Sequence, residues 1–326
     1  MAQTQAHSYP RLVGDIGGTN ARFGWLQEPG AAVTDIATLK AADHPSLTDA
    51  VRRYLDDQGK QPPPWCAIGI ANPVVGDHVQ MTNHDWSFSI SDVQRQLGLA
   101  RFLVINDFTA LALALPALDP AELRQVGGGH AVAGTPLALL GPGTGLGVSG
   151  LLPAGSGHSA IPIEGEGGHV TLAASDEREE QVVRVLRRRF GHASAERAVS
   201  GQGLVNLHAA LCDLDGDAGA TLSAAEITDR AAAGSDPRCV EVMELFFGFL
   251  GTVAGNLALS LGSRGGLYVG GGIVPRLGDA IDRSRFRERF EDKGRFRPYL
   301  VQIPTFVVQA KVSPALLGAA RALEDL

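Results

Sequence analysis

The sequence predicts an α/β protein with two domains, and three observations support this. Short apolar segments typical of buried strands alternate with segments of helical periodicity along the chain. The length of 326 residues allows two domains that each bury a core. Two similar strand–turn–strand units, each with a Gly/Thr turn, lie in separate halves of the chain, which is typical of a duplicated architecture.

The composition excludes several other classes of protein. Glycine accounts for 41 residues, well above the usual share of roughly 7%, but without the three-residue period of collagen. Hydrophobic residues make up 44% of the chain and charged residues 19%, which argues against disorder. We therefore expect the glycines to serve particular turns of a globular protein.

The net charge is −7, from 28 basic and 35 acidic residues, and this argues against nucleic acid or an anionic membrane as a partner. The densest basic run, Arg187 to Arg189, follows Glu177, Glu179 and Glu180 on one predicted helix. We interpret this run as a solvated helix face rather than a nucleic-acid surface.

Cysteine use and hydropathy indicate the compartment. Cys66, Cys212 and Cys239 form no C-x-x-C pair, which predicts a reducing compartment and neither a disulfide framework nor a zinc knuckle. The N-terminus lacks the apolar core of a signal peptide. Residues 245–263 carry no charge and are long enough to span a bilayer, but glycines and polar residues interrupt them. We expect a buried core helix there and a cytoplasmic protein.

The first half of the chain is expected to begin with a hairpin. The strand LVGDI, the turn GGTN and the strand ARFGWL follow one another over residues 11–26. The further elements expected are a helix over 46–58, strands over 66–71 and 102–105, and a helix over 108–115. The Pro- and Gly-rich segment 116–134 is expected to mark the crossing to the second domain.

The second half is expected to begin with a similar hairpin and then to be mainly helical. The hairpin consists of PLALLG, PGTG and LGVSGLL over residues 136–152. Asp176 with Glu179, and Ser223 with Glu226, have the spacing of capping boxes and predict the starts of two helices, which end at residues 190 and 233. The apolar face of the first helix is expected to be Val182, Leu186 and Phe190. The remaining elements expected are a helix over 237–261, a strand over 266–269 and a helix over 314–326.

Three glycine turns, at 14–20, 141–147 and 270–273, each follow a predicted buried strand. Such turns bring backbone N–H groups close to phosphate oxygens, although hairpins and tight packing also use glycine. The chain lacks a P-loop and the protein-kinase motifs, and the 141–147 turn precedes a strand where a dinucleotide fingerprint precedes a helix. The turns therefore predict a nucleotide site of another type.

Polar side chains at the ends of two predicted strands are candidates for chemistry. Asp15, beside the first glycine turn, suits Mg²⁺, or else caps the turn by Asx hydrogen bonds. Asp107 follows Asn106 at the end of an apolar strand and is a candidate general base for phosphoryl transfer to an alcohol. An N-cap role for Asp107 in the following helix is equally compatible with the sequence.

The turn I-E-G-E-G-G-H holds Glu164, Glu166 and His169. Carboxylates accept hydrogen bonds from sugar hydroxyls, so this turn suits a neutral polyhydroxylated ligand. A structural histidine and a metal site are the alternatives.

Five motifs resemble, in order, those of the bacterial glucokinase family, in the superfamily of sugar kinases, actin and heat-shock chaperone ATPases. They are D-I-G-G-T-N at 15–20, I-N-D-F-T-A at 105–110, G-P-G-T-G-L-G at 141–147, E-G-E-G-G-H at 164–169 and G-G-G-I-V-P-R at 270–276. The resemblance implies a two-domain actin-like ATPase (ribonuclease H-like) fold with an interdomain cleft. The smaller domain would comprise 1–116 and 308–326, and the larger one 117–307.

The resemblance implies a transferase of glycolysis that uses ATP and Mg²⁺ to phosphorylate glucose at its 6-hydroxyl, with Asp107 as the catalytic base. The residues that match the family's sugar ligands are Asn106, Asp107, Glu166, His169 and Glu196. Those that match its ATP-binding turns are Gly14, Asp15, Ile16, Gly17, Gly18, Thr19, Gly143, Thr144, Gly271 and Gly272. Asp15 would hold Mg²⁺ through water, and the 81–86 stretch resembles the family's sugar-side loop without an assigned role.

Several alternatives to this hypothesis remain at the level of sequence. Another hexose, such as mannose or an N-acetylated sugar, is an alternative substrate, and polyphosphate is an alternative donor. A sugar-responsive regulator is less favoured because only about ten residues precede the first strand, too few for a helix-turn-helix. An actin-like nucleotide switch would not need the sugar-binding cluster. The family resemblance also implies a homodimer, and no zinc is expected because the related kinases' Cys-rich motif is missing.

Overall fold

The computed structural model describes residues 8–155, 159–217, 220–310 and 312–324. The chain divides into two compact units. The first contains Met1–Asp119, Gly157–Glu164 and Ala310–Leu326, and the second contains Pro120–Ser156 and Gly165–Gln309. The first unit is therefore built from segments at both ends of the sequence. The segment 157–164, which we expected in the larger domain, is grouped here with the first unit.

The first unit is built on a five-stranded sheet of order β3-β2-β1-β4-β7. Its strands are β1 (Arg11–Ile16), β2 (Asn20–Leu26), β3 (Thr34–Lys40), β4 (Trp65–Ile70) and β7 (Arg101–Asn106). The β1–β2–β3 pairings are antiparallel, whereas β4 pairs parallel with both β1 and β7. The parallel strands β1, β4 and β7 therefore end at one edge of the sheet, as expected for an α/β ligand site. A separate ribbon pairs β5 (His78–Gln80) with β6 (Ser87–Ser89).

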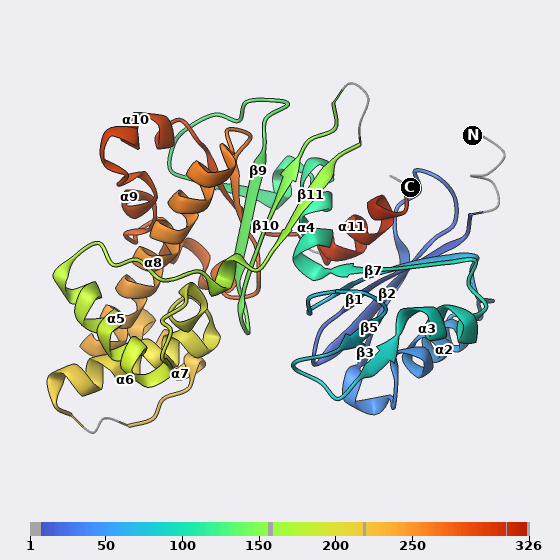
Figure 1. The fold of residues 1–326 in the computed structure, drawn as a ribbon, viewed down its shortest axis with the longest axis horizontal. Coiled ribbons are helices and arrows are strands. Elements are labelled where there is room, and N and C mark those ends of the chain that lie inside the picture. Colours follow the sequence, from blue (N-terminus) through green and yellow to red (C-terminus); the bar gives the residue numbers. More distant parts are fainter. Residues whose placement is uncertain (1–7, 156–158, 218–219, 311, 325–326) are drawn as a thin grey trace. The chain divides into compact units, whose positions relative to one another are not determined.

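Helices cover both faces of this sheet (Figure 1). The side chain of Leu12 packs in the core with α2 (Leu47–Asp57) and α3 (Ile90–Leu97). That of its neighbour Val13 packs with α11 (Pro314–Ala322), because successive strand residues face opposite sides. Helix α4 (Asp107–Ala114) packs against α11.

The contact between α4 and α11 is so close that it requires a glycine. A Cβ at Gly318 of α11 would overlap the carbonyl group of Ala110 in α4. Helix α11 is shorter than the expected 314–326, and residues 325–326 lie outside the described part of the chain.

The second unit is built on a six-stranded sheet of order β11-β10-β9-β12-β13-β8. Its strands are β8 (Leu123–Val126), β9 (Leu137–Pro142), β10 (Leu146–Leu152), β11 (Ile161–Gly165), β12 (Leu267–Val269) and β13 (Thr305–Val308). The predicted hairpin forms β9 and β10, whose register pairs Gly141 with Gly147. Strand β12 lies parallel to β9 and β13.

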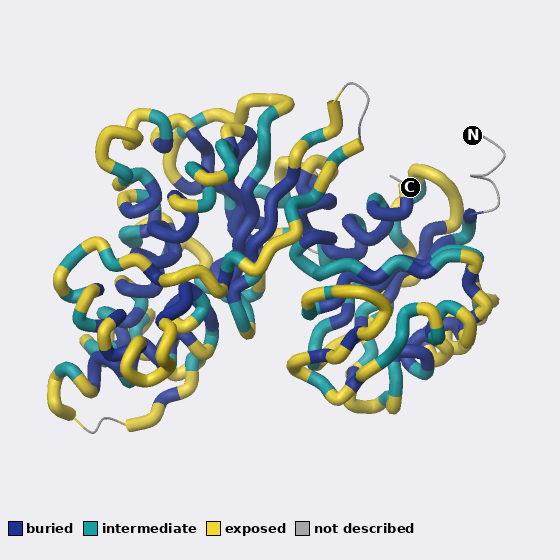
Figure 2. The backbone as a smooth tube through the Cα atoms, viewed as in Figure 1, coloured by how far each residue is buried: buried dark blue, intermediate teal, exposed yellow. Residues whose placement is uncertain are grey.

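Helices pack against this sheet, and most residues of the shared core belong to them. They are α5 (Glu177–Phe190), α6 (Gly201–Asp215), α7 (Ala224–Ala233), α8 (Pro237–Leu261), α9 (Phe286–Glu291) and α10 (Arg297–Leu300). Helix α8 contacts α6, α7 and α9. Figure 2 shows its central part, and the strands beside it, as buried.

Helix α8 is the one helix in the described residues that is long and apolar enough to cross a membrane. However, 72% of its most apolar window is buried inside the protein. This burial agrees with the expected core helix.

Both predicted helix caps are formed, but the structure corrects one detail of the α5 cap and one residue of the apolar face of α5. Ser223 and Glu226 make a complete capping box at the start of α7. At α5, Asp176 accepts from the backbone N–H of Glu179, but the Glu179 side chain accepts from Ser175 and not from Asp176. Phe190 was expected on the buried face of α5 and is instead exposed, with the guanidinium of Arg197 over its ring. The last turn of a helix extends beyond the core that its earlier turns contact.

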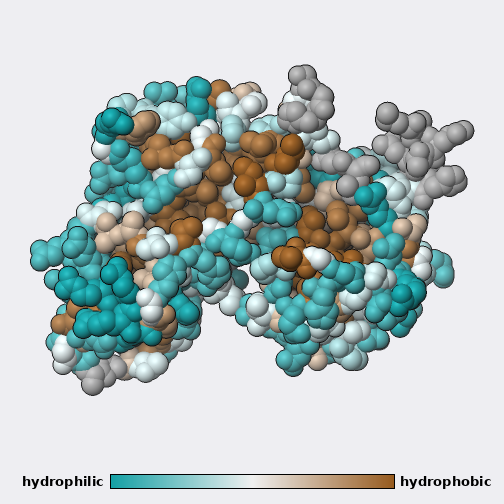
Figure 3. Space-filling view, viewed as in Figure 1, coloured by the Kyte–Doolittle hydropathy of each residue, from teal (hydrophilic) through white to brown (hydrophobic). Residues whose placement is uncertain are grey.

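The arginine run on α5 is exposed, as predicted. Figure 3 shows hydrophilic residues over this helix and apolar residues over β9 and β10. Arg189 is paired with Asp213 at 2.6 Å, so part of its charge is compensated within the chain.

Candidate active site

The glycine turn of the first hairpin is tied to the C-terminal segment by Asp15. The Asp15 Oδ2 atom accepts from Nη1 of Arg22 at 2.9 Å and from Oγ of Ser313 at 2.6 Å. The turn itself closes when Gly17 N–H donates to the carbonyl of Asn20. Asp15 is partly exposed, with 21% of its side chain accessible, so its carboxylate reaches both solvent and the turn.

The glycines of this turn have different physical roles. A Cβ at Gly18 would lie 2.6 Å from the carbonyl oxygen of Asn83, so the 81–86 loop packs directly on the turn. A Cβ at Gly14 would lie 2.7 Å from the Ile68 side chain, inside the sheet. Ile16 is fully buried. Gly14 and Ile16 therefore belong to the buried strand β1 that leads into the turn, whereas Thr19 is exposed.

Asn106 and Asp107 lie where β7 ends and α4 begins. The N-cap of α4 is Asn106, whose Oδ1 accepts from the N–H groups of Phe108 and Thr109 at 2.8 and 3.2 Å. Asp107 is therefore not the N-cap; it is the first residue of the helix, and its Oδ1 accepts from Phe108 N–H at 3.0 Å. The cap and this bond together orient the Asp107 carboxylate.

A neighbouring residue, Asn72, was not among the predicted site residues. Its carbonyl accepts from Nδ2 of Asn106 at 3.3 Å, and its Oδ1 accepts from the backbone and hydroxyl of Thr82. Asn72 thus links the end of β7 to the 81–86 loop. Its position two residues beyond β4, a parallel neighbour of β7, is the signal that could have identified it.

In the second unit, the two other glycine turns pack on each other. A Cβ at Gly141 would lie 2.6 Å from the backbone of Gly270. Gly271 has a φ of +76°, and a Cβ there would overlap the carbonyl oxygen of Pro142. Only glycine fits both positions, because the backbone segments touch and one of them is left-handed.

These turns border a cavity of about 1310 Å³ within the second unit. Gly143, Thr144 and Gly272 line it, so three predicted nucleotide-binding residues meet there. Gly271 is outside the lining but holds this turn against Pro142. The other walls come from α6, α7, α8 and the short helix η6 (Val274–Ile281). These walls were not predicted, because their side chains come from segments without a common motif.

The start of α6 lies beside the Gly143 turn. Gly201 N–H donates to the Gly143 carbonyl at 2.9 Å, and Gly201 lines the same cavity. The N-cap Ser200 accepts from Gly203 N–H at 2.9 Å. The positive end of the helix dipole favours anions there, which adds to the attraction of the turn for phosphate.

Glu166 and His169 are neighbours around the short helix η4 (Gly167–His169). The Nε2 atom of His169 is 4.0 Å from Oε2 of Glu166, and both side chains are more than half exposed. Glu164 lies on β11 and is also exposed. All three are accessible to a ligand, and Glu166 and His169 are brought together.

Glu196, on the short helix η5 (Ala195–Arg197), is bound to the second hairpin. Its Oε2 accepts from Leu146 N–H at 2.9 Å, at the start of β10. A Cβ at Gly145 would overlap the same carboxylate. One oxygen of Glu196 therefore supports the glycine turn.

Two α/β units, each with a glycine hairpin, are the architecture expected of the actin-like ATPase fold. The sequence profile of the glucokinase family matches residues 12–326. The chain is 58% identical over 319 residues to a glucokinase of Aromatoleum aromaticum, covering 98% of this chain and 96% of that protein. It is 53% identical to a glucokinase of Chromobacterium violaceum, covering 98% and 90%. This chain belongs to the glucokinase family.

The fold agrees with a solved member of this family. The crystal structure of a glucokinase from an Antarctic psychrotroph matches with a TM-score of 0.87 and 35% identity, covering 97% of this chain and 99% of that one. The resemblance of motifs and the fold expected from it are confirmed.

Proposed function

We propose that this protein transfers the terminal phosphoryl group of ATP to the 6-hydroxyl of glucose, forming glucose 6-phosphate and ADP. The convergence of Gly143, Thr144 and Gly272 on one large cavity is the observation that carries the proposal. Backbone N–H groups in such turns, beside the start of a helix, suit phosphate oxygens. The apolar side chains of Leu204 and Phe247, which also line the cavity, suit a nucleoside.

Asp107 acts as the general base in this proposal. Its carboxylate accepts the proton of the sugar 6-hydroxyl while that oxygen bonds to phosphorus and the bond to the ADP oxygen breaks. Because the transition state of phosphoryl transfer is loose, orientation of the hydroxyl matters as much as proton removal. The hydrogen bond from Phe108 N–H and the cap by Asn106 hold the Asp107 carboxylate in place, and the carboxylate in turn orients the hydroxyl.

The proposed sugar ligands are Asn106, Asp107, Glu166, His169 and Glu196. Carboxylates and an imidazole pair with hydroxyl groups without requiring a charged substrate. In Asn106 one side-chain donor is used by Asn72, so its contribution is to position Asp107 as well as to bind sugar.

Asp15 fits a role toward Mg²⁺ through water. A carboxylate is the type of ligand that Mg²⁺ prefers, and this one is partly exposed. Arg22 and Ser313 already use Oδ2, which favours a water-mediated contact over direct coordination. Bound Mg²⁺ would neutralise negative charge on the phosphates of ATP.

The decisive experiment is a coupled assay of ADP release with several hexoses and donors. Glucose with ATP should be preferred over mannose, N-acetylglucosamine and polyphosphate. Asp107→Asn should lower kcat by about 10²–10⁴-fold while glucose binding, measured by calorimetry, is retained. The matched control is Asp57→Asn, an exposed aspartate of α2 paired with Arg53, which should leave kcat unchanged. A preference for another hexose, or nearly full turnover by Asp107→Asn, would refute the corresponding part of the proposal.

A homodimer in the cytoplasm, without nucleic-acid or membrane partners, completes the proposal. The net charge of −7 argues against a nucleic-acid partner. The burial of α8 inside the protein argues against a membrane partner. Light scattering coupled to gel filtration tests the oligomeric state; a monomeric mass would contradict the dimer.

A further inference from the structure

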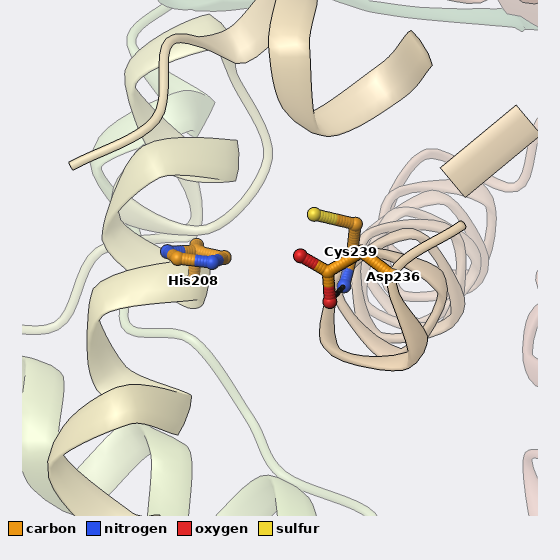
Figure 4. A group of neighbouring side chains, drawn as sticks. All are labelled: His208, Asp236 and Cys239. Atoms are coloured by element: carbon orange, nitrogen blue, oxygen red, sulfur yellow. Dashed lines mark hydrogen bonds between the residues drawn. The ribbon is translucent and has the colours of Figure 1, made fainter. Parts of the chain in front are cut away.

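Three side chains of types that bind metals in other proteins lie together where α6 faces the start of α8. One ligand atom from each of His208, Asp236 and Cys239 lies within 4.8 Å of the others. Figure 4 shows the His208 ring on α6 facing the Asp236 and Cys239 side chains at the start of α8. Cys212, also on α6, lies beside His208, with its Sγ 3.8 Å from Nδ1 of His208.

The local sequence explains why these four residues converge. His208 and Cys212 are four residues apart, which places them on one face of α6. Asp236 is the N-cap of α8 and Cys239 belongs to its first turn. The packing of α6 on α8 then brings the two pairs together. Neither H-x-x-x-C nor D-x-x-C has the C-x-x-C spacing, so their convergence depends on how the helices pack.

Burial makes this group different from surface acidic residues. Cys239 is fully buried, and His208 and Cys212 are 5% and 7% exposed. Asp236 is partly exposed and provides a path from solvent. Its carboxylate already accepts from the N–H groups of Arg238 and Cys239, so it is held in place before any ion binds.

The chemistry of the donor set indicates which metal would bind. Mg²⁺ and Ca²⁺ take oxygen ligands almost exclusively, whereas thiolate with imidazole suits Zn²⁺. Ligand atoms around a tetrahedral zinc are about 3.3–3.8 Å apart. A movement of about 1 Å would therefore bring these three ligands to the required spacing.

The surrounding charges are compatible with a bound dication. The Arg238 guanidinium is paired with Asp215 at 3.3 Å and with Asp217 at 3.1 Å. Arg230 lies 3.7 Å from Asp236. The Cys239 thiolate and the Asp236 carboxylate together neutralise the charge of Zn²⁺. A thiol gives up its proton when it binds zinc.

We propose that His208, Asp236 and Cys239 bind a Zn²⁺ ion. The ion would join α6 to α8. Both helices line the proposed nucleotide cavity, through Gly201 and Leu204 on α6 and Val240 and Met243 on α8. The metal would thus fix one wall of that cavity without taking part in phosphoryl transfer. The site is independent of the proposed kinase activity and is tested without an activity assay.

The test is a titration of the full-length, tag-free, reduced and EDTA-dialysed protein with Co²⁺ and then Zn²⁺. Co²⁺ should give thiolate-to-metal charge-transfer absorption at one equivalent per chain, and Zn²⁺ should abolish it by displacement. Zn²⁺ at a hundredfold excess over its Kd should raise the Tm by about 5–10 °C.

Three variants identify the ligands. Cys239→Ala, His208→Gln and Asp236→Asn should each weaken Zn²⁺ binding more than about 100-fold, beyond the loss expected from a residue that only supports a ligand. Asp236→Asn is the most informative, because asparagine caps a helix as well as aspartate and the protein should remain folded by circular dichroism. The matched control is Cys66→Ala, which removes a buried thiol from β4 and should leave Zn²⁺ binding unchanged.

The outcomes decide the proposal. Charge-transfer absorption that disappears in the folded Asp236→Asn and Cys239→Ala variants supports the site. No charge-transfer absorption, binding equal to wild type in Asp236→Asn, or loss of binding in Cys66→Ala would overturn it.

Discussion

The two glycine hairpins have the same local pattern of strand, Gly/Thr turn and strand, but different surroundings. In the first hairpin, polar side chains hold the turn: Asp15 accepts from Arg22 and from Ser313. In the second, backbone segments hold it, because Gly141 and Gly271 pack against the neighbouring turn. A side-chain hydrogen bond to the C-terminal segment thus distinguishes the first turn, and a backbone contact with the 270–273 turn distinguishes the second, so the two should respond differently to substitution.

The largest effect is expected from Gly271→Ala in the second unit. The substitution forces a left-handed backbone and an overlap with the Pro142 carbonyl oxygen, at a cost of about 2–5 kcal/mol. The Gly272 side of the cavity should move, so the KM for ATP should rise more than about tenfold. Urea unfolding and ATP kinetics measure both effects.

Gly59→Ala is the control for backbone conformation alone. Gly59 has a φ of +61° but no atom within 4 Å of a Cβ. Its free energy of unfolding should fall only by the cost of placing alanine in a left-handed backbone conformation, about 1–2 kcal/mol. Equal losses in the two variants would contradict the role assigned to backbone packing.

Glu196→Ala should have the next largest effect, again on the second hairpin. It removes the carboxylate that accepts from Leu146 N–H, and a hydrogen bond to a charged group contributes about 1.5–3 kcal/mol. Glu196→Gln keeps an acceptor and should lose less. Chemical unfolding of both variants, with the exposed Glu164→Ala as control, measures the difference. Similar losses for alanine and glutamine would show that this bond does not support the turn.

Gly18→Ala probes packing on the first turn. The new methyl group would lie 2.6 Å from the Asn83 carbonyl oxygen and should cost about 1–3 kcal/mol. In the same turn, a Cβ at Gly17 would have no neighbour closer than 3.6 Å. Gly17→Ala should therefore be the more stable variant in thermal unfolding. The reverse order would exclude contact with the 81–86 loop as the reason for glycine at position 18.

The smallest effect is expected from Ser313→Ala. It removes one of the two hydrogen bonds to Asp15 Oδ2, at 2.6 Å, and should cost about 0.5–1.5 kcal/mol. Ser260→Ala, on the exposed side of α8, should change the free energy of unfolding by less. A loss above about 3 kcal/mol would mean that Ser313 does more than hold Asp15.

Features set by neighbouring residues were predictable from the sequence. The two hairpins, the capping box at Ser223 and the start of α8 at Pro237 are present as expected. Alternating hydrophobicity and capping side chains act within a few residues, so their pattern is visible along the chain. The positions of Asn106 and Asp107 at a strand end were predictable for the same reason.

Features set by tertiary packing were not predictable. Whether Asn106 or Asp107 caps α4 depends on a difference of one residue in where the helix begins. The contact of Asn72 with Asn106 joins two strands that are distant in sequence. The roles of the site residues as ligands stay a prediction, because they depend on molecules that bind to the fold.

The return of α11 to the first unit has a consequence for synthesis on the ribosome. Residues 314–322 are translated after the whole of the second unit. Until then, Val13 and Ala67 lack the helix that buries them, and α4 lacks the partner that fits at Ala110. Because domains fold as units when their segments are available, we expect the second unit to mature first, although translation of the first begins earlier. A nascent chain arrested before α11 would therefore present an exposed apolar sheet face to chaperones.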